Sequence, residues 1–165
     1  MSSACLTFAT GQGISDEAVS VERKAGARHA REAAIYSRSL WDLEALIAET
    51  SHAGWDGFGA APVTAESVAR AHLLLESLPI GLPPAELSVD NAGDVWVEWS
   101  EGPHQVFSVA AGPGRVYSYA GLFGTSRVHG SEEMLDRIVE VVSIHLARLY
   151  PHRNPGPTRT LRRAR

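Results

Sequence analysis

The chain has 165 residues, of which 44% are hydrophobic and 21% charged, so its composition fits one folded domain and excludes a wholly disordered chain. Its net charge of -4 is unevenly spread, because residues 1–152 carry ten basic and nineteen acidic side chains, a net of -9. An acidic body excludes a phosphate-binding main surface. Cys5 is the single cysteine and no apolar stretch approaches about 18 residues, so we expect a cytoplasmic protein without internal disulfides or membrane spans.

The first half of the chain predicts helices. Residues 1–15 are small and polar, which predicts a flexible N-terminus. Residues 17–34 follow a helical period with few large apolar side chains, a pattern typical either of a solvated helix or of an arm that folds on a partner. A stronger amphipathic pattern follows, and Ser39 is placed to begin a second helix. After a glycine-rich loop, Thr64 is placed to cap a helix that ends before Pro79.

From Glu86 onward the apolar residues alternate with a period of two, which indicates strands. The turns between these strands are short and contain glycine, proline or asparagine, and such turns connect antiparallel neighbours. Ser131 is then placed to cap a last helix that ends at Pro151. The four predicted strands span residues 87–89, 95–100, 105–110 and 116–120.

This order of elements predicts an α+β fold, with helices packed on one face of a four-stranded antiparallel meander and with a C-terminal helix. The sequence contains no internal repeat that would argue for further units. We therefore expect a single domain over residues 16–150, followed by a disordered, arginine-rich tail over residues 151–165.

The loop Gly54–Ala60 places three glycines, two aromatic side chains and one carboxylate in seven residues. Glycine permits backbone conformations that other residues avoid, and aromatic side chains carry large burial energy. One interpretation is structural: Asp56 forms a turn, while Trp55 and Phe58 fill the seam between helix and sheet. The other is a recognition loop in which Asp56 accepts a hydrogen bond from a partner.

Three motifs lie within about residues 50–120, and the first of them belongs to this loop. They are Trp55-Asp56-Gly57-Phe58-Gly59-Ala60, Leu78-Pro79 and Gly93-Asp94-Val95-Trp96-Val97-Glu98-Trp99. Together they resemble a group of small uncharacterised bacterial proteins with a WDGYGA-type motif, followed by a helix and an antiparallel hairpin sheet. Phe58 stands where the group usually has tyrosine, so a role that needs that hydroxyl is not implied. The resemblance implies fold boundaries and no established activity.

The predicted sheet carries a second candidate surface. On one strand Val97 and Trp99 share a face, while Trp96 and Glu98 share the other. If helices cover the first face, the second could present Trp96 with Tyr117 and Tyr119, and an exposed aromatic patch marks a protein interface. The alternative is that other segments cover these rings. The predicted partner-binding residues are Trp55, Asp56, Phe58, Trp96, Glu98, Tyr117 and Tyr119.

The basic tail supports a different interpretation. It carries five of the fifteen basic residues within thirteen positions and no acidic one. A solvated end is one interpretation, and a contact with nucleic acid or with an acidic partner is the other. In the second case the protein is a nucleic-acid-associated regulator. The residues that would carry this binding are Arg159, Arg162, Arg163 and Arg165.

Catalytic patterns are sparse. The histidines lack metal-ligand spacing, so we predict no metal and no cofactor. Cys5 has no neighbouring base that could activate it. A small enzyme built on Asp56, Glu98 and His104 remains as a third interpretation.

These observations favour a non-catalytic protein-binding protein over an enzyme. Its acidity and small size fit an anti-CRISPR-like inhibitor, or an antitoxin-like partner, from a mobile or defence-associated locus. Such a protein acts by steric occlusion of a partner surface. We expect a protein partner, and a homodimer is left open.

Overall fold

The computed structural model describes residues 15–79, 81–133 and 135–152. Contacts divide the chain into two compact units, Met1–Arg31 and Glu32–Arg165. One helix, α1 (Asp16–Thr50), begins in the first unit and ends in the second. In the first unit every described side chain from 17 to 31 is exposed, and Ser15 caps the helix by accepting a hydrogen bond from the Ala18 N–H at 3.2 Å.

The prediction that a second helix begins at Ser39 is wrong, because α1 runs through this position without a break. The Ser39 side chain is buried and donates a hydrogen bond back to the carbonyl of Ile35 at 3.2 Å. A serine that bonds to the preceding turn is compatible with a helix interior. The capping pattern alone could not show whether Ser39 begins a helix or lies inside one.

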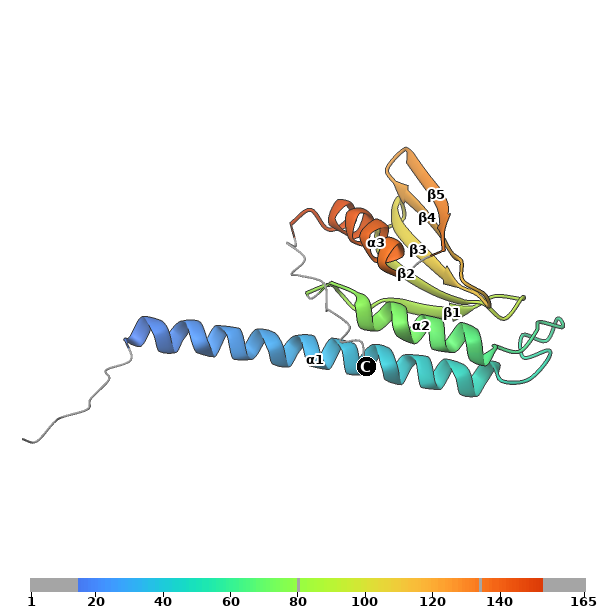
Figure 1. Ribbon diagram of the computed structural model, residues 1–165, viewed down its shortest axis with the longest axis horizontal. Helices are drawn as coiled ribbons and strands as arrows, with labels where there is room; N and C mark the ends of the chain where they lie inside the picture. Colours follow the sequence, from blue (N-terminus) through green and yellow to red (C-terminus); the bar gives the residue numbers. More distant parts are fainter. Residues whose placement is uncertain (1–14, 80, 134, 153–165) are drawn as a thin grey trace, which may run out of the picture. The chain divides into compact units, whose positions relative to one another are not determined.

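The second unit continues with helix α2 and an antiparallel sheet of five strands in the order β1-β2-β3-β4-β5, followed by helix α3 (Figure 1). The predicted α+β class and the meander are confirmed, but the predicted number of four strands is wrong. Thr64 caps α2 as predicted, since its side chain accepts a hydrogen bond from the Ser67 N–H at 3.0 Å. The elements are α2 (Ala65–Ser77), β1 (Glu86–Val89), β2 (Val95–Gly102), β3 (Gln105–Ala111), β4 (Tyr117–Phe123), β5 (Ser126–Glu132) and α3 (Leu135–Leu149).

Strand β5 occupies residues that we expected to precede a helix. Its seven residues are mostly polar, with Val128 as the one large apolar side chain, so they carry little strand propensity. They form a strand because the two-residue turn Gly124-Thr125 folds them back onto β4, and Gly124 has the positive φ of 66° that such a turn needs. Ser131 therefore lies in β5 and does not cap the last helix; its hydroxyl lies 3.2 Å from that of Ser118.

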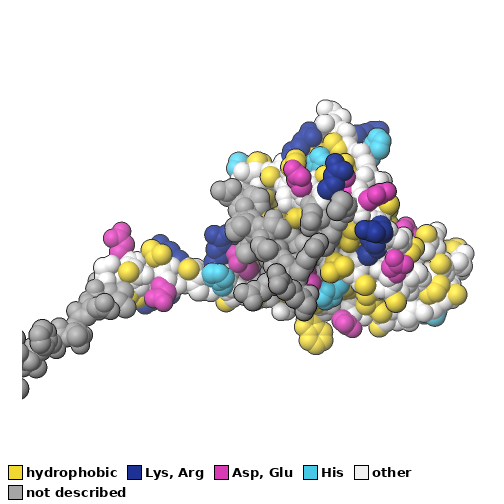
Figure 2. Space-filling view, viewed as in Figure 1, with side chains coloured by type: hydrophobic (Ala, Val, Ile, Leu, Met, Phe, Trp, Pro, Cys, Tyr) yellow, Lys and Arg dark blue, Asp and Glu magenta, His cyan; other side chains and the backbone are white. Residues whose placement is uncertain are grey.

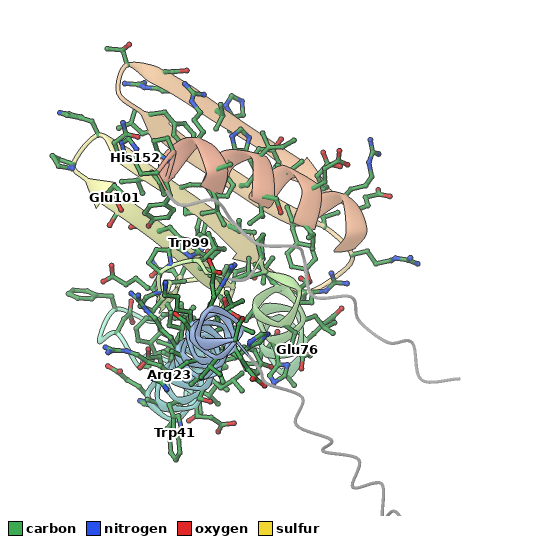
Figure 3. The ribbon with its side chains drawn as sticks, turned by 90° about the vertical axis from the view of Figure 1, so that its left-hand side faces the viewer. Arg23, Trp41, Glu76, Trp99, Glu101 and His152 are labelled. Carbon is green, nitrogen blue, oxygen red and sulfur yellow. The ribbon has the colours of Figure 1, made fainter. Side chains whose placement is uncertain are left out.

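Helices α2 and α3 cover one face of the sheet (Figure 1). The covered face takes alternate residues of each strand, because side chains on a strand point to opposite sides in turn. Trp99 lies at the centre of this core, between the sheet and the helices (Figure 3). The buried residues on the strands are Val89, Val95, Val97, Trp99, Phe107, Val109, Ala111, Tyr117 and Phe123.

The connection between α1 and α2 is attached to the turn between β1 and β2. The Ala61 N–H donates to the carbonyl of Asn91 at 3.0 Å. Gly93 has a φ of 87°, and a Cβ on it would lie 2.5 Å from the carbonyl oxygen of Pro62. Only glycine fits this position, because it needs both the left-handed backbone and the missing side chain.

We expect Gly93→Ala to destabilise the protein more than Gly114→Ala does. Both residues have a positive φ, but a Cβ on Gly114 would meet nothing within 4 Å. The left-handed backbone alone costs alanine roughly 1–2 kcal/mol, and the clash with Pro62 adds to this at Gly93 only. Urea unfolding of both variants measures the difference. Equal losses of unfolding free energy would show that the α1–α2 connection does not pack against the β1–β2 turn at Gly93.

Candidate functional site

The loop Gly54–Ala60 is organised around its own carboxylate. The Asp56 Oδ1 atom accepts hydrogen bonds from the N–H groups of Phe58 at 2.8 Å and Ala60 at 3.0 Å. These bonds, that from Ala60 first, hold the pKa of Asp56 below its usual value. The Gly54 N–H closes the loop by donating to the Ala60 carbonyl at 2.8 Å. Asp56 therefore serves the loop that contains it, as the structural interpretation expects.

A second aspartate repeats this arrangement in the β1–β2 turn. The Asp90 Oδ1 atom accepts from the N–H groups two and four residues later, those of Ala92 at 2.9 Å and Asp94 at 3.0 Å. Its Oδ2 atom accepts from the Trp96 Nε1–H at 3.0 Å. Burial raises the pKa of Asp90, but the hydrogen bonds from Trp96 and Asp94 outweigh it and the pKa is lowered. The charged carboxylate thus fixes both the turn and the Trp96 ring.

The two aromatic residues of the loop differ in their surroundings. Trp55 is half-buried and donates from Nε1 to the Ala61 carbonyl at 3.0 Å, so it packs as the structural interpretation expects. Phe58 does not fill a seam, because it is 95% exposed. Hydrophobic side chains, in yellow, gather over this connection between α1 and α2 (Figure 2). Phe58 is therefore a large apolar group that the loop holds in solvent.

The predicted aromatic patch of Trp96, Tyr117 and Tyr119 is wrong. Cross-strand pairs form one row of Val95, Ala111 and Tyr117 and another of Val97, Val109 and Tyr119, so both tyrosines lie on the face that the helices cover. Tyr117 is only 2% exposed, and its hydroxyl donates to the Arg70 carbonyl of α2 at 3.2 Å. Trp96 lies on the opposite face, between its cross-strand partners Ser88 and Ala110.

We call this opposite face the open sheet face, because among the described residues no helix packs on it. Serine and alanine make up half of it, and it is half-buried or exposed apart from Ser108 and Ala110 at its centre. Trp96 is its only aromatic residue. By strand register it consists of Glu86, Ser88, Trp96, Glu98, Ser100, Val106, Ser108, Ala110, Ser118, Ala120, Leu122, Arg127, His129 and Ser131.

Two carboxylates lie side by side on the open sheet face. Glu86 and Glu98 are direct cross-strand partners of β1 and β2. Within the described part of the chain, no ion pair involves either of them. Like charges directly opposite each other weaken a sheet, so this pair destabilises the sheet locally. A cation beside the pair would reduce the repulsion.

His145 of α3 packs among aromatic rings on the covered face. Its ring centroid lies 5.0 Å from that of Phe107, 5.7 Å from Phe123 and 5.8 Å from Tyr119. Its Nδ1 atom is buried and has no hydrogen-bond partner among the described residues. Burial, and then the Arg148 charge, lower the pKa of His145. The group is a packing residue whose neutral form the folded protein favours, and no reactive partner lies beside it in this cluster.

The three residues of the proposed enzyme do not come together. The loop of Asp56 is attached to the turn that precedes β2, while His104 lies in the turn that follows it. Glu98 lies between these ends, on the open sheet face. A strand of this length spans roughly 27 Å, so Asp56 and His104 cannot act on one substrate atom.

Trp41 is a surface residue that the patterns in the sequence do not identify. It is 76% exposed and projects from α1 away from the sheet (Figure 3). It follows Leu40 directly and therefore falls outside the apolar stripe that the helical period identifies. A tryptophan off the stripe is the signal that could have revealed it.

The remaining expectations meet fewer observations. Arg159, Arg162, Arg163 and Arg165 lie outside the described residues. Over residues 15–79, 81–133 and 135–152, no group of three histidine, cysteine or acidic side chains could hold a metal ion. In the same ranges, no helix has the combination of length and apolar content that crossing a bilayer requires.

No family model, curated protein or solved structure matches the chain. The resemblance to the group with the WDGYGA-type motif therefore stays a prediction.

We expect Asp56→Asn to lower the stability of the protein at neutral pH and to weaken its dependence on acid. A carboxylate with a lowered pKa stabilises the fold fully above its unfolded value of 3.8 and loses this as the pH falls through the lower, folded value. Asparagine lacks the charge that attracts the two N–H groups. Thermal unfolding between pH 2 and pH 7 measures this. Glu101→Gln, at the exposed end of β2, should keep the wild-type profile, and an unchanged profile in Asp56→Asn would contradict the loop geometry.

We expect His145→Phe to remove a loss of stability that the wild type shows on mild acidification. Because the folded pKa of His145 lies below the unfolded value of 6.5, its neutral form supports the fold fully above 6.5, and this support is lost as the pH falls through the folded pKa. Phenylalanine cannot be protonated and suits the aromatic neighbours. Urea unfolding at pH 5 and pH 7.5 tests this, with the exposed His52→Phe as control. A wild type equally stable at both pH values would count against it.

Proposed function

We propose that this chain is a non-catalytic protein-binding protein that uses the open sheet face together with Phe58. The observation that carries the proposal is the composition of this face, where small side chains surround a single tryptophan. Tryptophan is enriched at the centre of protein interfaces. Small side chains allow another protein to approach the sheet closely.

The aromatic side chains at one end of this surface support the proposal. Asp90 fixes the Trp96 ring, and the loop that carries Phe58 is attached to the turn of Asp90 through Ala61 and Asn91. A side chain that is already ordered loses little entropy on binding. Tryptophan in such a setting is the type of residue that dominates binding energy.

The unpaired carboxylates indicate the chemistry of the partner. Glu86 and Glu98 repel each other on the free surface, and an arginine or lysine from a partner would relieve this repulsion. The acidic balance of residues 1–152 favours the same kind of partner. A protein that covers a basic surface in this way acts by steric occlusion, as an inhibitor or an antitoxin-like partner does.

Ala120→Arg tests the proposal, because it places a long side chain on the exposed part of β4 in the open sheet face without removing a contact. We expect this variant and Phe58→Ala to lose the proteins that photo-crosslinking captures with the wild type in lysates of the cells that make it. Each should lower affinity at least about tenfold. Ala147→Arg is the matched control, since Ala147 is exposed on α3.

Two results would overturn the proposal. One is a wild type that captures nothing above the level of an unrelated acidic protein. The other is capture that Ala120→Arg and Ala147→Arg retain equally, which would place binding elsewhere. Circular dichroism of each variant confirms that a loss of capture does not arise from unfolding.

A further inference from the structure

The second half of α1 carries an apolar surface that faces away from the core. Over residues 32–50, Leu43 is buried in the hydrophobic core, while Trp41, Ala45 and Ala48 are exposed. These three are spaced four and three apart, so they share one face of the helix. Two carboxylates, Asp42 and Glu49, border this face and are seven residues apart. A large exposed tryptophan beside small residues is a surface suited to another helix.

The acidic border of this face also has open space beside it. Asp42, Glu49 and Glu86 line a groove of about 450 Å³ between α1 and residues 84–87, together with Arg38. Arg38 Nε lies 3.7 Å from Asp42, but both side chains are largely exposed, so this pair contributes little. The groove leaves room for further basic side chains next to the two carboxylates.

The first unit of the chain carries a complementary surface. Its helical residues 17–31 are all exposed, and an isolated helix of this length is only marginally stable in water. Ala27 and Ala30 share one face of this segment, and Lys24 and Arg31 border that face. These two basic residues are seven apart, the same spacing as that of Asp42 and Glu49.

We propose that this chain forms a two-fold symmetric homodimer, in which the helical segment 17–31 of one copy packs antiparallel on the Trp41 face of the other. Antiparallel alignment sets Lys24 against Glu49 and Arg31 against Asp42 of the second copy. The same alignment places Trp41 on the partner's Ala30, and Ala45 and Ala48 on its Ala27. A two-fold axis repeats this contact, as in most homodimers.

The match of charge and size is what selects a second copy as the occupant. Both charge pairs and both apolar contacts follow from one alignment of residues 17–31 with residues 41–49. Alanine against alanine lets two helices approach closely, and the large Trp41 meets a small residue. Neither segment belongs to the open sheet face, although Glu86 of that face also lines the groove beside Asp42 and Glu49.

Sedimentation equilibrium of the full chain over a range of concentrations tests the dimer. We expect a reversible monomer–dimer equilibrium, in which Trp41→Ala raises the dissociation constant about 30-fold, the effect of a typical interface tryptophan. Ile144→Ala is the matched control, because Ile144 is also a large exposed apolar residue but lies on α3. It should leave the equilibrium unchanged.

A charge exchange tests the alignment itself. The double variants Lys24→Glu/Arg31→Glu and Asp42→Lys/Glu49→Lys should each be monomeric, because each brings like charges together. Mixing the two should restore a dimer that contains one copy of each. Glu22→Lys, on another side of the helix, should dimerise like the wild type.

Three results would overturn this proposal. They are a wild type that sediments as a monomer up to millimolar concentration, a dimer that Trp41→Ala and Ile144→Ala affect equally, and double variants whose mixture fails to form a mixed dimer. The first result would mean that any partner of the Trp41 face is a different protein. All three leave the capture experiments on the open sheet face unaffected.

Discussion

The contact between two aspartate-centred turns is the constraint on which the rest of the surface depends. Asp56 and Asp90 each bind two N–H groups of their own turn, and the hydrogen bond from Ala61 to Asn91 joins the turns. Gly93 lets the chain pass against Pro62 at this point. The join sets where α2 starts, how Phe58 is presented and how Trp96 is held. The carboxylates of Asp56 and Asp90 therefore stabilise the two turns by hydrogen bonding and are not free for chemistry.

The covered and open faces of the sheet follow from the register between strands. Both turns that flank β3 preserve the alternation, so odd-numbered residues of β2, β3 and β4 point toward the helices. A shift of the β3–β4 pairing by one residue would bring the tyrosines to the open side. The helices enclose Tyr117 and leave Trp96 outside because of this register. A single aromatic residue among small ones is the result.

Local chemistry explains which features could be predicted from the sequence. The Thr64 cap, the alternation in β2 and the turn residues act over a few positions, and each was predicted correctly. The face that carries Tyr117 depends on pairing between strands, which a single strand does not specify. Strand β5 has weak propensity and exists because β4 is its neighbour, so only the turn at Gly124 signals it. Trp41 was missed because helical periodicity identifies the buried residues of a helix and does not identify the exposed ones.

The self-contained hydrogen bonding of Asp56 has a consequence for how such a protein diverges. A loop motif whose carboxylate is saturated by its own backbone specifies a shape and leaves the choice of partner to other residues. Descendants of a common ancestor could therefore keep Asp56 and the glycines of this loop unchanged while Phe58 and the sheet positions around Trp96 change with each new target. In such a lineage the motif would trace ancestry, and the variable positions around it would record what each member binds.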